Sequence, residues 1–236
     1  MPMPGNLYIV ATPIGNLKDL TQRAKETLES VGFVVCEDTR VTSKIMATLG
    51  IRKTLKAWHQ RASDAALQSI IREIEQGTDA AYTSDAGTPG VNDPGGKLVA
   101  LALDQGIKVI PIPGPSALTA AISVCGFPME HFAYLGFVPH KKGRLTYFKD
   151  IAAREEAVVF FESTHRLLKT LESLVEFLDE GRGTRDAGRC VFVGRELTKM
   201  HETLYRGTAQ EVLDAVKATS DKGEAVLIIA PKDFKP

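Results

Sequence analysis

Short apolar runs alternate with amphipathic stretches along the first half of the chain. The apolar runs are four or five residues long and predict strands at 7–11, 33–36, 54–58, 80–83 and 108–112. The stretches between them repeat apolar residues three or four positions apart, which predicts helices at 20–31, 43–49, 64–74 and 97–104. Asp19 stands where the N-cap of the first helix is expected. Such alternation predicts a mostly parallel sheet with helices on both faces.

A stretch of turn residues and aromatics at 126–139 predicts a linker, after which the alternation resumes. Apolar runs predict strands at 157–161, 190–194 and 225–230, and helical periodicity predicts helices at 166–178 and 209–218. Thr208 and Glu211 have the spacing of a capping box at the start of the last helix. We therefore predict an α/β protein of two α/β domains, 1–125 and 126–236, with a mostly parallel N-terminal sheet and a mixed C-terminal sheet.

The composition is that of an ordinary globular protein. Of 236 residues, 44% are hydrophobic and 25% are charged. The 29 Lys and Arg residues balance the 29 Asp and Glu residues, so any contact with nucleic acid has to be local. The sequence has no signal region or membrane-length apolar run, and Cys36, Cys125 and Cys190 stand apart among apolar neighbours. We expect a cytoplasmic protein with reduced, buried cysteines and no bound metal or membrane.

Three loops rich in glycine and proline follow predicted strands. They are ATPIGNL at 11–17, SDAGTPGVNDPG at 84–95 and PGPSA at 113–117. Each loop alone is explained equally well as a connector, but carboxyl ends of parallel strands are where open α/β sheets bind ligands. The loops contain neither the dinucleotide-binding nor the Walker pattern. Within the second loop, we expect Asp93 to hold the turn together through backbone amides.

Three clusters of charged residues also follow predicted strands. They are Glu37, Asp38 and Arg40; Glu162, His165 and Arg166; and Arg195, Glu196 and Lys199. A buried ion pair between neighbouring loops explains the first cluster as well as a functional role does. Lys199 is a candidate base if burial or Arg195 depresses its pKa. A salt bridge from Lys199 to Glu196 or Glu202 is an equally good interpretation.

The loops and clusters together resemble one known family. ATPIGNL, CEDTR, SDAGTPGVNDPG, PGPSA, GFVPHKKGR, FFESTHRL, RELTKMHE and GEAVLII occur in the order typical of the RsmI-type methyltransferases, between about residues 7 and 229. These proteins are part of the tetrapyrrole-methylase superfamily, the class III S-adenosylmethionine-dependent methyltransferases. The resemblance implies 2′-O-methylation of the ribose of cytidine 1402 in 16S ribosomal RNA of the small subunit. It also implies a cofactor cleft between two α/β domains and a homodimer.

The resemblance further implies which residues contact S-adenosylmethionine. They are Pro13, Ser84, Asp85, Ala86, Gly87, Thr88, Pro89, Val91, Ser116 and Ala117. Asp85 would accept from the amino group or the ribose of the cofactor, while Gly87 and Pro89 let the backbone approach closely.

Candidates for contacts with the RNA come from the charged clusters. For substrate binding they are Asp38, Arg40, Arg166, Arg195 and Glu196; for catalysis they are Lys199, Glu37 and His165. Basic residues at 140–144 and at Arg182, Arg185 and Arg189 are further candidates for RNA phosphates.

Two other functions fit the same fold. One is a methyltransferase that acts on a tetrapyrrole, which would need arginines arranged for several carboxylates. The other is a protein that retains the cofactor fold and docks on the ribosome without catalysis.

Overall fold

A computed structural model describes residues 3–59, 63–179 and 188–235. The chain divides into two compact units, Met1–Ser116 and Ala117–Pro236. The division lies earlier than the predicted domain boundary at 125/126. Helix α5 (Ala117–Cys125) accounts for the difference, because it packs against strands of the second unit.

The first unit contains a five-stranded sheet in the order β3-β2-β4-β1-β5, and every strand pair is parallel. The strands are β1 (Leu7–Val10), β2 (Phe33–Cys36), β3 (Thr54–Ala57), β4 (Ala80–Thr83) and β5 (Val109–Ile112). The mostly parallel sheet expected from the apolar runs is confirmed.

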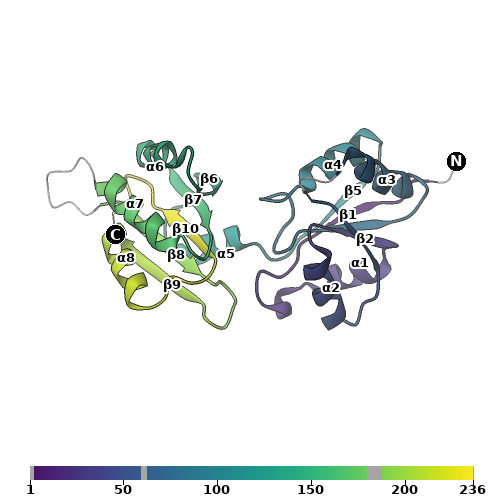
Figure 1. The fold of residues 1–236 in the computed structure, drawn as a ribbon, viewed down its shortest axis with the longest axis horizontal. Helices are drawn as coiled ribbons and strands as arrows, with labels where there is room; N and C mark the ends of the chain where they lie inside the picture. The colour runs from purple at the N-terminus through teal and green to yellow at the C-terminus, as the bar shows by residue number, and fades with distance from the viewer. Residues whose placement is uncertain (1–2, 60–62, 180–187, 236) are drawn as a thin grey trace. The chain divides into compact units, whose positions relative to one another are not determined.

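Helices cover both faces of this sheet (Figure 1). They are α1 (Gln22–Ser30), α2 (Thr39–Thr48), α3 (Asp64–Glu75) and α4 (Gly95–Asp104), and a short 3-10 helix spans Leu17–Asp19. Successive strand residues point to opposite faces, so Val34 packs with α1 and α2 whereas Val35 packs with α3 and α4. Each face of the sheet therefore has its own buried core.

Two helix starts differ from the sequence prediction. The hydroxyl of Thr21, not Asp19, caps α1 by accepting from the amide of Ala24 at 3.1 Å. Asp19 lies in the preceding 3-10 turn, so its predicted capping role is wrong. Helix α2 begins at Thr39, earlier than predicted, because the Asp38 carboxylate accepts from the amide of Arg40 at 2.8 Å.

The second unit contains a mixed five-stranded sheet in the order β6-β7-β10-β8-β9. Among the strand pairs of the described residues in this unit, β6–β7 is the only parallel one. The strands are β6 (Phe132–Phe137), β7 (Ala157–Glu162), β8 (Cys190–Arg195), β9 (Thr203–Thr208) and β10 (Ala225–Ile229). The other helices are α6 (Arg144–Ala153), α7 (Leu167–Asp179) and α8 (Ala209–Ala218). The predicted mixed sheet is confirmed, and so is the capping box at Thr208 and Glu211.

The predicted linker at 126–139 is wrong, because this segment contains strand β6. The strand pairing shifts register between Tyr134 and Phe137, and Gly136 has φ +66°. This bulge hides the alternation by which a strand is recognised. Strand β9 and helix α6 were also missed by the sequence analysis.

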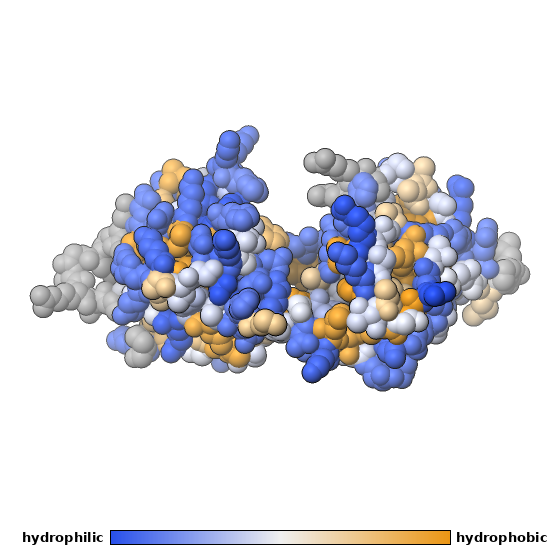
Figure 2. All heavy atoms as spheres, turned by 60° about the horizontal axis from the view of Figure 1, so that its bottom comes forward, coloured by the Kyte–Doolittle hydropathy of each residue, from blue (hydrophilic) through white to orange (hydrophobic). Residues whose placement is uncertain are grey.

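The interior of the second unit is built by α6, α7 and α8 against one face of the sheet, around Phe148, Leu171 and Val212. All three cysteines of the chain are buried and free, as expected. In the view of Figure 2, hydrophobic residues lie in small groups between hydrophilic ones in both units. None of the helices that the structure describes is both long and apolar enough to cross a membrane.

A buried carboxylate lies at the end of β7. Glu162 is 1% exposed, and its carboxylate lies 2.6 Å from the guanidinium of Arg166 and 3.9 Å from that of Arg144. It also accepts from the hydroxyl of Thr170 at 2.6 Å and from the amide of Ser163 at 2.7 Å. The charge is thus paired and hydrogen-bonded, and it ties α6 and α7 to the sheet.

We predict that Glu162→Ala lowers the free energy of unfolding of the second unit by about 3–5 kcal/mol, because it leaves two largely buried guanidinium groups without their counter-charge. Urea denaturation measures the change. The control is Glu172→Ala, which removes an exposed partner of Lys217 at 3.7 Å and should cost less than about 1 kcal/mol. Equal losses in the two variants would contradict the role given to the buried pair.

Candidate functional site

The three predicted loops of the first unit meet at the carboxyl end of its sheet. Thr12 and Gly87 exchange two backbone hydrogen bonds, each 3.0 Å long, and form an isolated antiparallel bridge. The hydroxyl of Thr88 donates to the carbonyl of Pro115 at 2.9 Å. The loops at 11–17, 84–95 and 113–117 therefore form one continuous backbone wall.

The backbone of this wall changes direction at Gly87. Its φ is +79°, and an added Cβ would lie 3.2 Å from Cγ2 of Ile14 and 3.7 Å from the Pro115 carbonyl oxygen. The hydroxyl of Ser84 donates to the Gly87 carbonyl at 3.1 Å, and the hydroxyl of Thr12 donates to the Ser84 carbonyl at 3.2 Å. Ser84 thus supports the wall from inside instead of presenting its hydroxyl to solvent.

The remaining predicted cofactor residues vary in exposure. Pro13 and Pro89 are buried, Ala86 is exposed, and the others, Asp85, Thr88, Val91, Ser116 and Ala117, are half-buried. Next to this loop, the Thr83 hydroxyl is buried and has no hydrogen-bond partner among the described residues. The surface therefore combines small side chains with polar groups, and an unsatisfied hydroxyl is buried next to it.

The loop that follows β2 is connected to this edge of the sheet by a hydrogen bond to Asp85. Its Oδ1 accepts from the backbone amide of Asp38 at 3.0 Å, which ties the end of β2 to the end of β4. Burial raises the pKa of Asp85. Burial also raises the pKa of Glu37, and the charges of Asp85 and Asp93 add to the shift. Asp85 and Glu37 therefore hold their protons more tightly than isolated carboxylates do.

The charged cluster of Glu37, Asp38 and Arg40 forms an exposed ion pair and not a buried one. Arg40 pairs with Asp38, the N-cap of α2, at 2.6 Å, and the Arg40 side chain is 87% exposed. The hydrogen bond from Arg40 lowers the pKa of Asp38 to about 2. The alternative of a buried pair between neighbouring loops is wrong, because Arg40 sits in the first turn of α2 and faces solvent.

Asp93 holds the long loop together, as predicted. Its carboxylate accepts from the amides of Gly90 at 2.5 Å and Gly95 at 2.8 Å, and from the hydroxyl of Tyr82 at 2.9 Å. The same carboxylate thus fixes two turns of the loop and its approach to α4.

In the second unit, Arg166 uses its donors internally. Its guanidinium donates to the hydroxyl of Ser163 at 2.9 Å and the carbonyl of Val138 at 3.0 Å, besides pairing with Glu162. His165 is exposed beside it. The geometry gives Arg166 a structural task, while the His165 ring remains accessible.

Arg195 is likewise buried, at 6% exposure. Its guanidinium donates to the Thr203 hydroxyl at 2.9 Å and to the carbonyls of Lys222 at 2.5 Å and His201 at 3.2 Å. It therefore braces the turn between β8 and β9, which carries Lys199.

The ammonium group of Lys199 lies between two carboxylates, 2.8 Å from Glu196 and 2.9 Å from Glu224. Burial alone would lower the pKa of Lys199, but these two partners outweigh it and raise the pKa above its ordinary value. The depressed pKa that Lys199 would need to act as a base is therefore not found. The salt bridge with Glu196 is found, whereas Glu202 instead accepts from the amide of Thr198 at 2.6 Å.

The same turn holds strain that the sequence did not reveal. Glu196 and Thr198 have φ of 51° and 66°, and left-handed backbone is rare for a β-branched residue such as threonine. The Thr198 hydroxyl is buried, with no partner in the described part of the chain. Such strain costs on the order of 1–3 kcal/mol and is concentrated at functional sites. In the sequence, only its position next to Lys199 indicated that Thr198 is of functional interest.

The two basic clusters differ from expectation. His140, Lys141 and Lys142 are exposed, but Arg144 is drawn into the network of Glu162. The guanidinium of Arg189 donates to four backbone carbonyls of its own unit, so it acts as a structural clamp. Arg182 and Arg185 lie outside the described residues.

Comparison with known proteins gives a consistent result. The sequence profile of the tetrapyrrole (corrin/porphyrin) methylases matches residues 6–213. Ribosomal RNA small subunit methyltransferase I of Escherichia coli O157:H7 is 43% identical over 228 residues, which cover 95% of this chain and 77% of the relative. The protein of the same name from Thermotoga maritima is 38% identical over 229 residues, which cover 97% of this chain and 100% of the relative.

The family resemblance found in the sequence is therefore confirmed, together with its α/β fold. The chain belongs to the tetrapyrrole methylase family, in the group of proteins named ribosomal RNA small subunit methyltransferase I.

Proposed function

We propose that this protein transfers the methyl group of S-adenosylmethionine to 16S ribosomal RNA of the small subunit, at the ribose 2′-hydroxyl of cytidine 1402. The observation that carries the proposal is the near full-length similarity, at 38–43% identity, to relatives named for methylation of small-subunit ribosomal RNA. The resemblance also leads us to propose that it acts in the cytoplasm as a homodimer.

The backbone wall around Gly87 fits such a cofactor. Asp85 offers a carboxylate for hydroxyl or amino groups, and glycine at position 87 lets a ligand approach the backbone. The buried Thr83 hydroxyl, which lacks a partner among the described residues, lies one residue before the loop. Ser116 and Ala117 precede and begin α5, where backbone amides suit an anionic group. We assign to this cofactor surface the ten residues predicted from the sequence.

When bound, S-adenosylmethionine supplies an electrophilic methyl group on a sulfonium. The protein then has to align the ribose hydroxyl, exclude water and receive or stabilise the hydroxyl proton. Among the three predicted catalytic residues, Glu37 suits the base best, because its raised pKa makes it a stronger proton acceptor near neutrality. His165 is the second candidate for this role.

Lys199 suits a different task. Its raised pKa keeps it protonated, so we propose that its ammonium group stabilises the developing alkoxide and does not accept a proton. Among the predicted substrate ligands, Arg40 has the most accessible charge for a phosphate. Asp38 orients Arg40, while Arg166, Arg195 and Glu196 hold the turns that present neighbouring groups.

The decisive experiment supplies labelled S-adenosylmethionine and small ribosomal subunits that lack the modification. We expect one methyl group per subunit, which nuclease mapping and mass spectrometry locate on the ribose of cytidine 1402. A methyl group on the base or at another nucleotide would overturn the proposed position. Transfer to a tetrapyrrole but not to RNA would overturn the substrate class, and cofactor binding without any transfer would indicate a docking protein.

Asp85→Asn tests the cofactor surface. The amide keeps an acceptor for the Asp38 backbone but removes the charge, so we expect affinity for S-adenosylmethionine to fall about tenfold. Isothermal titration calorimetry measures the affinity. Asp104→Asn, an exposed change at the end of α4, is the control. Equal affinities for both folded variants would remove Asp85 from the site.

Lys199→Met tests the cation. We expect methyl transfer to fall roughly 10²–10³-fold while cofactor affinity is retained, because the stem remains and the charge is lost. Lys199→Arg should retain more activity than Lys199→Met, since a guanidinium keeps the charge but cannot act as a base. Single-turnover kinetics provide the rates, with exposed Lys222→Met as the control. If both Lys199 variants were equally inactive, a proton-accepting role would be favoured instead.

A further inference from the structure

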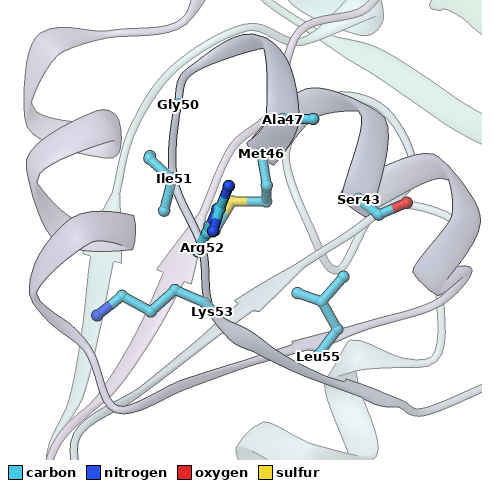
Figure 3. A pocket seen from close by; sticks show the side chains of 8 residues that line it. All are labelled: Ser43, Met46, Ala47, Gly50, Ile51, Arg52, Lys53 and Leu55. Atoms are coloured by element: carbon cyan, nitrogen blue, oxygen red, sulfur yellow. The ribbon is translucent and has the colours of Figure 1, made fainter.

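A pocket of about 470 Å³ lies in the first unit, apart from the Gly87 wall. It is formed by α2, the connection after it and the edge strand β3 (Figure 3). Its lining residues are Ser43, Met46, Ala47, Gly50, Ile51, Arg52, Lys53 and Leu55. The size is typical of sites that bind small molecules or parts of larger ones.

The apolar side of this pocket is pre-formed. Met46 and Ile51 are 3% and 7% exposed and are part of the core between α1, α2 and the sheet, with Leu55 packed against it. Because these side chains are fixed by packing, the pocket keeps its shape without a ligand. Since Met46 and Ile51 are nearly inaccessible, the apolar surface open to a ligand comes chiefly from the exposed Ala47 and the half-buried Leu55.

The polar side is cationic and contains no carboxylate. The ammonium group of Lys53 donates to the Val31 carbonyl at 2.6 Å, which fixes it beside the end of α1. The exposed Arg52 has no hydrogen bond or ion pair from its guanidinium within the described ranges. In Figure 3 Arg52 and Lys53 follow one another on the connection after α2, and the Lys53 side chain extends away from the other labelled side chains. An exposed guanidinium among the lining residues suits both the stacking of a base and the binding of a phosphate.

Helix α2 connects this pocket with the proposed catalytic edge. Arg40, Ser43 and Ala47 have the spacing of one helix face, and seven residues of helix rise about 10 Å. Arg40, at the start of α2, is the exposed cation next to Glu37. An RNA strand that binds Arg40 can continue along this face of α2 toward the pocket, where Arg52 follows the end of the helix at Thr48.

We propose that this pocket binds a nucleotide of the RNA strand that flanks the acceptor cytidine, with its base against Ala47 and Leu55 and its phosphate at Arg52. The proposal rests on the proposed function, since it adds a second contact with the same substrate. A second copy of the chain, pairing along the free edge of β3, is the competing occupant.

Two variants of the full chain test the pocket without altering its core. Arg52→Ala removes the cation, and Ala47→Trp fills the pocket from an exposed position on α2. The control is Arg72→Ala on α3, whose helix packs on the other face of the sheet and whose side chain is also exposed. Thermal melting and calorimetry with S-adenosylmethionine verify that each variant is folded and binds the cofactor.

We expect both pocket variants to raise the KM for small subunits roughly 5- to 20-fold, with kcat and cofactor affinity within about twofold of the parent. With a short single-stranded RNA centred on the acceptor cytidine, Arg52→Ala should also reduce the slope of log affinity against log salt by about 0.7. Arg72→Ala should change neither quantity.

Three results would overturn the inference. Pocket variants that match Arg72→Ala in KM and salt slope would show that no nucleotide binds there. A change in oligomeric state by sedimentation, with RNA affinity retained, would identify the surface as a contact between copies. A parent protein that neither binds nor methylates small-subunit RNA would refute the proposed function itself, and this inference with it.

Discussion

The first unit depends on the pair of backbone hydrogen bonds between Thr12 and Gly87. These bonds close the ends of β1 and β4 into one surface, and they require a residue with φ +79° where an added Cβ would press on Ile14. Ser84 and Thr12 use their hydroxyls to hold the loop, which leaves Asp85 to join the adjacent loop at Asp38.

The second unit depends on a different constraint, because it buries the charged side chains of Glu162 and Arg195. Glu162 and Arg195 are each nearly inaccessible, and each is surrounded by partners that satisfy its charge or its donors. Burial of a charge is tolerated only with such compensation. The strained turn at Glu196–Thr198 rests on this bracing, because Arg195 fixes the strand from which the turn departs.

The sequence predicted elements well where local signals agreed. The bounds of β2 and α8 match the prediction, because one is an uninterrupted apolar run and the other has a capping box and a clear period. Strand β6 was missed because its bulge breaks the alternation. The meeting of the three Gly/Pro-rich loops could also be predicted, because the carboxyl ends of parallel strands lie at one edge of the sheet. By contrast, the bond from Asp38 to Asp85 joins residues 47 positions apart, and no local pattern encodes it.

The chemical roles could not be predicted from residue type, since they depend on such distant partners. The pKa is raised for both Lys199 and Glu37, yet the consequences are opposite. For a lysine, a raised pKa preserves the cation and removes it as a base near neutrality. For a glutamate, a raised pKa improves the proton acceptor while it is still ionised. Glu224, which lies 25 residues from Lys199 along the chain, is one of the partners that raise the pKa of Lys199. The sequence therefore indicated where charged groups gather, but only the fold determines which of them can carry a charge and which can take a proton.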